Sequence, residues 1–571
     1  MKALVVALAL AFASAAHAQS AAELAGLWEA KLRFGPDVRG PLTIAHDADG
    51  WRAEIAGRTA TVTLSGERVT FDLGESAGSF DGRFDAKKTR IDGHWIQPRT
   101  ATFGSRFATP LVLTKSRENL WRGEVAPLDD QYRFYIHIAS RPDGSVGAFL
   151  RNPERNLQRR MRIASVTRDG STLRFLDDKG ALVSEAVMHD GAFSIYWPRY
   201  GGTYDFERAA VSDFYPREKP GAKYVYHPPR PRDDGWSVAA VEEVGISREG
   251  ITRFIQMLVD TPMSGAAANE MHGVLIARHG KLVVEEYFHG EHADKLHDSR
   301  SAAKSLTATL VGAAMQSGVA LAPSDSVYRV MGRDPATLEP RKRALTLEHL
   351  LTMTSGFFCD DNNPDAPGNE DRVINDDSEF DYYKVALDLP MESDPGTHPV
   401  YCSISAHLAG GVLQRAAGKP LPQLFQELIA GPMQMKRYAM NLTPAGDAYM
   451  GGGVRFLPRD FMKLAQMMMN GGTWNGRRIV SKEFAERASS PLVHIGKRGF
   501  GYFWWLDERP YRGRMIKTYM AGGNGGQIAM AVPELDLVIG FWGGNYSTGE
   551  TFTAQNVYVP DWILPAVDEA H

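Results

Sequence analysis

Residues 301–304 read Ser-Ala-Ala-Lys, and nowhere else in the 571-residue chain does a lysine follow a serine by three positions. The stretch from Ser301 to Met315 reads as a helix that Gly318 ends. Positions i and i+3 share a helix face, so Lys304 lies within reach of the Ser301 hydroxyl. A buried lysine that loses its proton near neutral pH can make such a serine nucleophilic, and a helix N-terminus favours the developing negative charge.

Four further segments follow this motif, and a strand pair around His279-Gly280 precedes it. They are LTLEHLLTMTSGF at 345–357, Tyr401-Cys402-Ser403 before a helix, GGGVRFLPRDFMKLAQMM at 451–468, and Gly523-Asn524-Gly525-Gly526-Gln527 before a strand. In this order the segments resemble the serine β-lactamase and penicillin-binding-protein superfamily, in its class C-like esterase and amidase branch. The resemblance covers about residues 241–565 and implies an α+β domain, an antiparallel sheet with a helical subdomain.

The resemblance implies a role for each matching residue. Ser301 would be the acylated nucleophile, Lys304 its base or proton relay, and Tyr401 the partner that shares the proton and protonates the leaving group. Residues 524–527, laid on the family's Lys-Thr-Gly-x turn, put the oxyanion hole at the backbone N–H groups of Ser301 and Gln527, to within one position. The implied substrate-binding residues are Ser403, Asn524, Gly525 and Gly526.

Two departures from the family pattern bear on the substrate. Ser403 stands where the family usually has Asn, and Asn524 stands where it has Lys or His. Those missing groups help to hold a β-lactam or peptide carboxylate, so we expect hydrolysis of esters or small amides, as in esterases and 6-aminohexanoate-dimer hydrolase. A β-lactamase or D-Ala-D-Ala carboxypeptidase of the same fold is the alternative. A non-catalytic binding protein disagrees with the intact Ser301, Lys304 and Tyr401.

The N-terminal part has a β pattern and an internal repeat. Leu27-Trp28 recurs at 120–121, LTIAHDADG at 42–50 recurs as IHIASRPDG at 136–144, and GERVTF at 66–71 recurs as GSTLRF at 170–175. We expect a duplicated all-β region, barrel-like or sandwich-like, with units at 19–117 and 118–225. A proline-rich linker at 226–240 would lead to the α+β domain at 241–571. Because every catalytic motif lies in that domain, we expect residues 235–571 alone to retain hydrolysis.

The first 18 residues read as a signal peptide with an 11-residue apolar run and an Ala-x-Ala site, which predicts cleavage after Ala18. The mature protein would be periplasmic or secreted, with no membrane span. The formal net charge of −4 disfavours nucleic-acid binding, and no histidine spacing suggests a metal ion or other cofactor. The expected partner is a small ester or amide substrate, and the oligomeric state stays open.

Three smaller features complete the sequence-based picture. Cys359 and Cys402 are the only cysteines, and in an exported protein of this fold they would flank one cleft, which predicts a disulfide; two buried thiols that never meet are the alternative. Residues 360–381 hold nine acids and one base, read either as a solvated loop or as a filter for cationic substrate ends. Gly74–Gly78 matches a Gly-x-Ser-x-Gly elbow, but we interpret it as a turn between strands.

Overall fold

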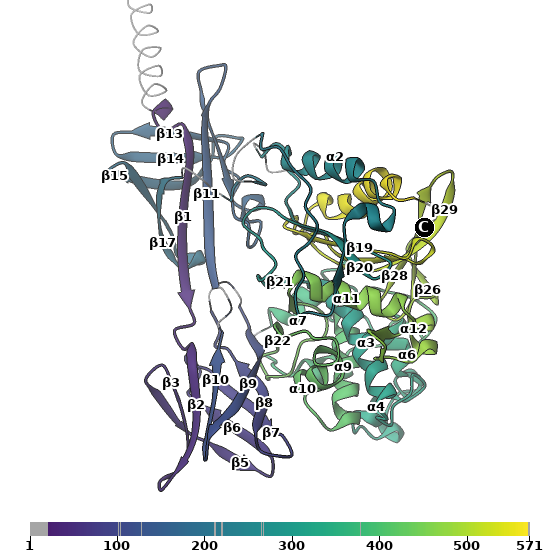
Figure 1. The fold of residues 1–571 in the computed structure, drawn as a ribbon. Helices are drawn as coiled ribbons and strands as arrows, with labels where there is room; N and C mark the ends of the chain where they lie inside the picture. Colours follow the sequence, from purple (N-terminus) through teal and green to yellow (C-terminus); the bar gives the residue numbers. More distant parts are fainter. Residues whose placement is uncertain are drawn as a thin grey trace, which may run out of the picture.

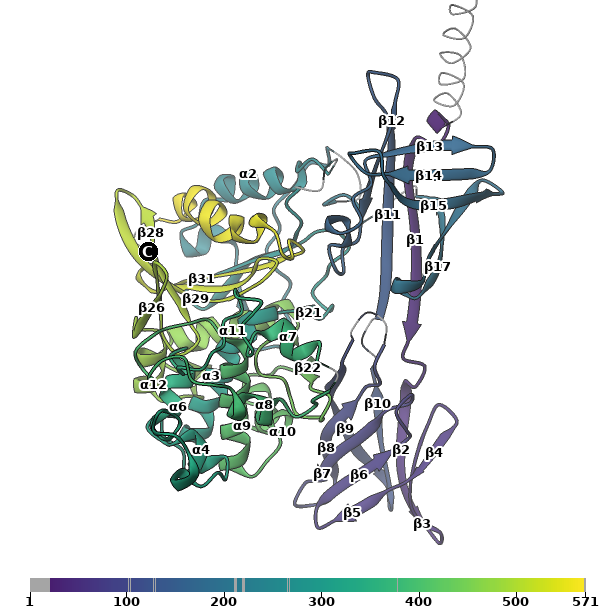
Figure 2. The ribbon, with the colours of Figure 1, turned by 180° about the vertical axis from the view of Figure 1, so that it is seen from behind.

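The structure is a computed structural model that describes residues 21–568, apart from positions 101, 103, 127, 129, 210–212, 218–220, 264, 266–267 and 377. The predicted signal peptide lies outside the described residues. Two all-β units stand along one side of the molecule and an α+β domain along the other (Figures 1 and 2). The expected order, an all-β region followed by an α+β domain, is confirmed.

The first β unit is a closed eight-stranded barrel. Its long strand β1 (Gly26–Gly35) pairs with β11 (Asp130–Ser140) on one side and with β17 (Gly202–Arg208) on the other. Aromatic side chains, among them Trp28, Phe134 and Phe193, are buried inside and fill it. The remaining strands are β12 (Val146–Arg151), β13 (Ser165–Asp169), β14 (Thr172–Leu176), β15 (Leu182–His189) and β16 (Ala192–Trp197).

The second β unit, which we name the curled sheet, spans residues 40–125. Its nine strands follow the order β4-β3-β2-β10-β9-β8-β7-β6-β5, and only Val62 separates the two end strands in the chain, so the sheet curls on itself. The strands are β2 (Gly40–Asp47), β3 (Gly50–Ile55), β4 (Arg58–Thr61), β5 (Thr63–Ser65), β6 (Arg68–Asp72), β7 (Ser79–Phe84), β8 (Arg90–Ile96), β9 (Arg106–Arg117) and β10 (Leu120–Val125).

The predicted unit boundary at 117/118 is wrong, because the two units exchange their Leu-Trp strands. β1, with Leu27-Trp28, lies in the barrel beside β11, whereas β10, with Leu120-Trp121, lies in the curled sheet beside β2. In both units the Leu-Trp strand pairs with the strand that carries the repeated segment 42–50 or 136–144, namely β2 or β11. The repeat is therefore visible in the order of the strands. An antiparallel ladder depends on matching register and buried faces and not on proximity in sequence. The curled sheet is thus an insertion whose ends meet where Gly35 pairs with Asp130.

The α+β domain is built on a nine-stranded sheet of order β18-β20-β19-β31-β30-β29-β28-β27-β26. The helix α2 (Arg248–Val259), with Ser247 as the predicted N-cap, and the C-terminal helical segment Ala554–Ile563 cover one face. The helices α3 (Ala303–Gln316), α9 (Ser403–Ala417) and α11 (Pro458–Met469) lie on the other (Figure 1). The strands are β18 (Ser237–Val238), β19 (Met271–Arg278), β20 (Lys281–Tyr287), β26 (Val493–Ile495), β27 (Arg498–Phe500), β28 (Trp505–Tyr511), β29 (Arg514–Gly523), β30 (Gln527–Val532) and β31 (Leu537–Gly543).

Short helices complete the helical part: α4 (Val327–Val330), α5 (Pro340–Ala344), α6 (Leu347–Leu351), α7 (Glu370–Ile374), α8 (Tyr382–Asp388), α10 (Leu421–Phe425) and α12 (Lys482–Ala488). A small ladder joins β21 (His297–Asp298), β23 (Arg455–Phe456) and β22 (Tyr438–Leu442). The outer strand β22 also pairs with β9 of the curled sheet, with Met440 opposite Ala108. The curled sheet and the α+β domain therefore share backbone hydrogen bonds.

The proline-rich segment at 226–240 is a docked strap and not the free linker that its composition predicts. The Tyr226 hydroxyl donates to the Val283 carbonyl at 2.8 Å, and the Trp236 indole N–H donates to the Arg459 carbonyl at 3.1 Å. Both rings are buried because they pack on the α+β domain. None of the helices in the described residues is long and apolar enough to cross a membrane.

Candidate active site

The segment before α3 is a strained turn that presents Ser301. Arg300 has a φ of 50°, in the left-handed region that residues other than glycine rarely adopt. Its N–H donates to the Asp298 carboxylate at 2.9 Å, and its carbonyl accepts the Gly453 N–H at 3.3 Å. These bonds hold the turn in place, and one 3-10 turn, Arg300–Ala302, leads from it into α3. Ser301 is half-buried.

The three predicted catalytic side chains lie together in the structure. The Lys304 Nζ donates to the Ser301 Oγ at 3.0 Å and also to the carbonyl of Gly451. The same ammonium lies 4.9 Å from the ring centroid of Tyr401, which stacks on Trp505. Lys304 is only 2% exposed, so these contacts operate away from bulk water.

The charge state of Lys304 differs from the sequence-based expectation of a lysine that loses its proton near neutral pH. Burial lowers the pKa of Lys304, but the opposing effects of Tyr401, Glu370 and Asp361 outweigh it, so the pKa is raised. The site therefore holds an ammonium at rest. Because an ammonium cannot accept a further proton, the proton of Ser301 must pass to another group, and Tyr401 is the side chain beside Lys304.

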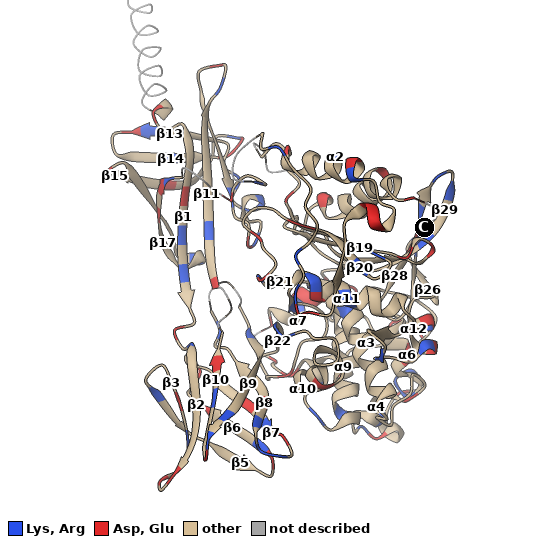
Figure 3. Cartoon of the chain, in the orientation of Figure 1, with Lys and Arg blue, Asp and Glu red and all other residues tan. Residues whose placement is uncertain are grey.

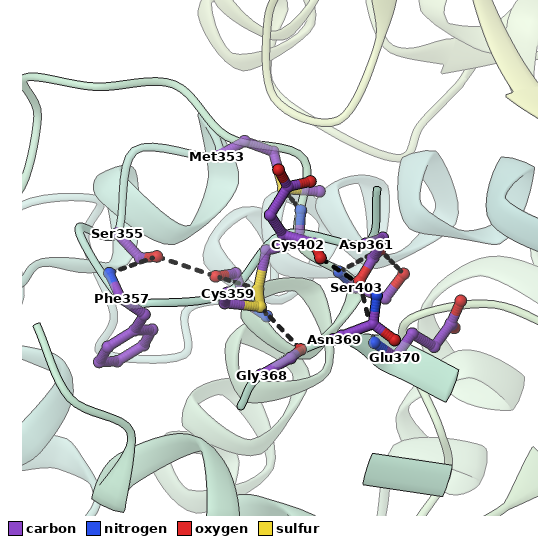
Figure 4. Close-up of a disulfide and its surroundings, with 12 residues drawn as sticks. Met353, Ser355, Phe357, Cys359, Asp361, Gly368, Asn369, Glu370, Cys402 and Ser403 are labelled. Atoms are coloured by element: carbon purple, nitrogen blue, oxygen red, sulfur yellow. Dashed lines mark hydrogen bonds between the residues drawn. A yellow bond between two sulfur atoms is a disulfide. The ribbon is translucent and has the colours of Figure 1, made fainter. Parts of the chain in front are cut away.

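A disulfide joins Cys359 to Cys402 (Figure 4), and Cys402 directly follows Tyr401 in the chain. The Cα atoms are 5.5 Å apart, and the bond spans 43 positions of sequence. It brings Asp361 to the start of α9, where the Ser403 N–H and hydroxyl donate to one Asp361 oxygen at 2.9 and 2.6 Å. The Asp361 N–H in turn donates to the Tyr401 carbonyl at 3.0 Å. The backbone that carries Tyr401 is thus held from two sides.

Two acids of the 360–381 segment face the site, which sequence reasoning did not foresee for individual residues. The Glu370 N–H donates to Asp361 at 3.1 Å, and Glu370 accepts the Tyr449 hydroxyl at 2.6 Å. Burial raises the pKa of Glu370, Lys304 opposes the rise and Asp361 adds to it. The segment is therefore more than a solvated loop, although nothing in its composition marks these two acids among nine.

The structure brings Gly523, and not Gln527, against the turn that carries Ser301. A Cβ on Gly523, the last residue of β29, would lie 2.3 Å from the Ser299 carbonyl oxygen and 3.0 Å from the Ala302 nitrogen. Gln527 lies on the next strand, opposite Gly523, and its fully buried side chain donates to the carbonyls of Gly543 and Asn524. The strand end that meets the serine turn is thus Gly523, four positions before the residue assigned to the oxyanion hole.

Most of the predicted substrate-binding residues are enclosed. Ser403 is 0% exposed and occupied by Asp361, so it positions that carboxylate and cannot touch a substrate. Gly525 and Gly526 are buried as well, Gly525 beneath the Tyr546 ring. Only Asn524 is exposed, and its side-chain oxygen accepts the Ser547 N–H at 2.7 Å. Asn524, Gly525 and Gly526 all follow Gly523 in the chain, and Gly523 is the residue that meets the serine turn. The third motif was therefore placed four positions too far along the chain.

Two exclusions made from the sequence can be compared with the structure. Residues 74–78 form a turn between β6 and β7 with no helix after it, unlike a nucleophile elbow. Within the described residues, no three His, Cys, Asp or Glu side chains cluster so as to hold a metal ion.

Comparisons with known proteins agree with this arrangement. A family model described as Beta-lactamase matches residues 252–551. A curated relative, the 6-aminohexanoate-dimer hydrolase of Paenarthrobacter ureafaciens, is 23% identical over 222 residues, which are 37% of this chain and 55% of that protein. The chain thus spans about half the length of this relative.

Solved structures with a similar fold include two hydrolases. A protein named as a 6-aminohexanoate-dimer hydrolase from Bacillus anthracis is 18% identical with a TM-score of 0.43, covering 51% of this chain and 78% of its own. A family VIII carboxylesterase is 17% identical with a TM-score of 0.44, covering 58% and 99%. Because the family model spans more than half of the sequence, the chain belongs to the Beta-lactamase family.

Proposed function

We propose that this protein is a serine hydrolase that cleaves esters or small amides through an acyl-enzyme on Ser301. The observation that carries the proposal is the contact between the Lys304 ammonium and the Ser301 hydroxyl at 3.0 Å, with the Tyr401 ring beside it. A serine hydroxyl needs a partner that accepts its proton, and this buried pair supplies one.

The reaction would proceed in two halves. In the reacting state Lys304 carries the proton of the pair, so the Tyr401 oxygen accepts the Ser301 proton as the Ser301 oxygen attacks the carbonyl carbon, and Tyr401 then protonates the leaving alcohol or amine. Water attacks the acyl-enzyme in the second half and gives its proton to Tyr401, which passes it to the departing Ser301 oxygen as the acid is released. The developing oxyanion would be held by the Ser301 N–H and by a backbone N–H at the end of β29, next to Gly523, as its close approach to the serine turn supports.

The raised pKa of Lys304 gives the acids of the site a part in this mechanism. Asp361 and Glu370 keep the ammonium charged, and the ammonium stabilises negative charge that forms on Ser301 during attack. Both acids are fixed by hydrogen bonds to other groups, so they would act through Lys304 and not on the substrate.

Ester or small-amide substrates fit better than β-lactams. The Asn of the family's second motif, which helps to hold a carboxylate, is replaced here by Ser403, and the Ser403 side chain is enclosed. The name of the curated relative, an amide hydrolase, agrees with this class. We expect short p-nitrophenyl esters to be hydrolysed far faster than nitrocefin or penicillins, measured as kcat/KM; a nitrocefin rate equal to the ester rate would reject this substrate class.

The nucleophile can be tested directly with a fluorophosphonate probe. Ser301→Ala should abolish labelling, whereas Ser76→Ala, at the exposed turn between β6 and β7, should leave labelling intact. Lys304→Ala should lower the acylation rate by about 10²–10⁴-fold, because it removes both the ammonium that stabilises charge on Ser301 and the proton partner of Tyr401. Labelling that persists in Ser301→Ala, or disappears in Ser76→Ala, would assign the nucleophile elsewhere.

We also propose that the protein is exported and that Ala18 is the last residue of the cleaved leader. The disulfide beside Tyr401 supports an oxidising compartment, since such bonds rarely persist in a reducing cytosol. N-terminal sequencing of protein recovered from the periplasm or medium should give Gln19 as the first residue. Recovery of the intact N-terminus in the cytosolic fraction alone would contradict export.

A further inference from the structure

A polar cavity of about 370 Å³ lies between the barrel and the α+β domain. The barrel contributes Gln131 and Arg133 from β11, together with Glu154 and Arg155 from the loop after β12. Across it lie the 291–298 segment and Arg300, which precedes Ser301 directly. Charged positions of both signs occur on β11 and around β21 and α7 (Figure 3). The volume falls within the usual range of small-molecule sites, about 300–1,000 Å³.

The charges around the cavity leave a cation without a partner. Six basic and four acidic side chains line it. Three of the acids pair with basic residues of the same wall: Glu154 with Arg133 at 2.9 Å, Glu291 with Lys295 at 2.5 Å, and Asp298 with Arg300 at 3.3 Å. The fourth, Asp294, pairs with Arg232 at 2.6 Å. In the part of the chain that the structure describes, the Arg155 guanidinium makes no ion pair or hydrogen bond. Burial acts to raise the pKa of the nearby Asp130 and Asp298 carboxyls, and the charge of Arg155 is one of those that oppose this rise.

Buried polar groups on the cavity wall also lack partners. They are the Gln131 side-chain oxygen, one Arg133 nitrogen and the His272 Nε2, on residues that are 6%, 6% and 2% exposed. Burial lowers the pKa of Arg455 on the same wall, and although Asp298 opposes this, Arg155 and Arg300 lower it further, as expected in a positive potential. Buried polar groups are nearly always hydrogen-bonded. The Arg133 nitrogen is a donor suited to an anion, whereas the Gln131 oxygen is an acceptor that calls for a donor such as water or a hydroxyl of the occupant.

We propose that this cavity binds a small oxyanion, a carboxylate or phosphate group, and that Arg155 of the barrel is its main ligand. A guanidinium offers paired N–H donors that match such a group. The anion is either free in solution or the carboxylate end of a substrate that extends past Arg300 from Ser301; this second source rests on the proposed function. The barrel then has a definite role, since the site exists only while its β12–β13 loop is docked.

Binding can be measured without any catalytic turnover. Inorganic phosphate and glutarate are titrated by calorimetry into the full-length Ser301→Ala protein, alone and with a second substitution. We expect saturable binding of at least one anion that Arg155→Gln weakens by about tenfold or more and Arg155→Lys weakens less. The matched control is Arg160→Gln, which removes the same charge from an exposed position of the same loop, outside the cavity; it should leave the affinity unchanged.

The source of the anion is separated by hydrolysis of two esters that differ by one carboxylate, p-nitrophenyl butyrate and the mono-p-nitrophenyl ester of glutaric acid. A tenfold fall in kcat/KM for the glutarate ester alone in Arg155→Gln assigns the cavity to the substrate carboxylate. An unchanged ester ratio, with Arg155-dependent phosphate binding, assigns it to a free oxyanion. The proposal is overturned if neither anion binds and the ester ratio is unchanged, or if Arg155→Gln and Arg160→Gln weaken binding equally. The butyrate ester alone reports on the proposed hydrolase activity, so the two failures are distinguishable.

Discussion

The two β units share a strand order but dock on the α+β domain through different chemistry. The curled sheet is joined by a backbone ladder between β9 and β22 and by a neutral hydrogen bond of 2.7 Å from His94 to the Tyr438 hydroxyl. The barrel is joined by an ion pair of 2.8 Å between Arg151 and Glu270, 1% and 3% exposed, and by Asn156, which donates to the Tyr546 carbonyl. The two β units therefore share their order of strands, but they differ in the residues that contact the α+β domain.

The difference originates in one insertion. In the curled sheet a tight turn at Ala56-Gly57 links β3 to β4, whereas in the barrel the RNPERNLQRR segment follows β12. That segment supplies Arg155, Asn156 and Gln158, which reach the cavity, Tyr546 and Glu270 respectively. The barrel therefore contributes to the surroundings of the site, and the curled sheet supports the domain from further away.

Removal of whole units should give the largest effect. The sequence alone predicts that residues 235–571 retain hydrolysis, but the structure leads us to expect that this fragment aggregates or is inactive. It would expose the β22 edge and leave Glu270 without Arg151. Hydrolysis of p-nitrophenyl butyrate and size-exclusion chromatography measure the outcome, and a monomeric fragment with full activity would contradict the dependence on the barrel.

Excision of the curled sheet alone is the matched comparison. Because Gly35 pairs with Asp130, the two can be joined by a two-residue turn in place of residues 36–129. This variant also exposes the β22 edge, but it keeps the Arg151–Glu270 pair, so we expect it to fold and to hydrolyse the same ester within about tenfold of the intact chain. If excision abolishes folding while the 235–571 fragment stays active, the roles of the two units are reversed.

Arg151→Met should be the most damaging single substitution at the two interfaces. It leaves the Glu270 carboxylate buried without its partner, which typically costs about 3–5 kcal/mol. Denaturant unfolding of the full chain measures the loss. The double variant Arg151→Met/Glu270→Met should recover most of the stability, because the penalty belongs to the unpaired charge; equal losses in the single and double variants would exclude that cause.

Low pH should weaken the curled-sheet interface through His94. Burial lowers the pKa of His94 from 6.5 to about 4, against a small opposing effect of Asp81. The unfolded chain therefore binds a proton that the folded chain does not between pH 6.5 and 4, and stability falls as the pH falls through this range. At pH 5 the lowered pKa of His94 reduces the free energy of unfolding by about 2 kcal/mol relative to neutral pH. His94→Gln should reduce the loss in unfolding free energy between pH 7 and pH 5 by that amount, and an unchanged pH dependence would refute it.

Tyr438→Phe should have the smallest effect of the series. It removes the hydroxyl that bonds to His94 and to Gln426 but keeps the packed ring, so we expect a loss of about 1–2 kcal/mol at neutral pH. The β9–β22 ladder, which is made by backbone atoms, should persist. Thermal unfolding of the Tyr438→Phe and Arg151→Met variants compares the two losses of stability. A larger loss for Tyr438→Phe would mean that the curled sheet, and not the barrel, makes the more important contact with the α+β domain.

Sequence reasoning succeeded where chemistry depends on local spacing. The i, i+3 relation of Ser301 and Lys304 follows from helix geometry, and the Ser247 cap and the His279-Gly280 turn are likewise local. Sequence reasoning failed at the third motif, where the glycines of GGNGG allow several ways to match the family pattern. Only the packing of Gly523 against Ser299 shows which glycine meets the serine turn. It also could not choose Asp361 and Glu370 among nine acids, because their roles depend on a long-range disulfide and on Tyr449.

The sequence by itself indicated the family, the order of the motifs, the presence of a β duplication, and the serine, lysine and tyrosine that the structure brings together. These depend on composition, periodicity and short spacing, which the chain carries in one dimension. Only the tertiary structure showed which β unit contains which Leu-Trp strand and that the proline-rich strap is docked. It also showed that the surroundings of Lys304 raise its pKa and that Arg155 lines a cavity together with Arg300. Register, burial and the field of distant charges set those properties, and each arises only when segments far apart in the chain are packed together.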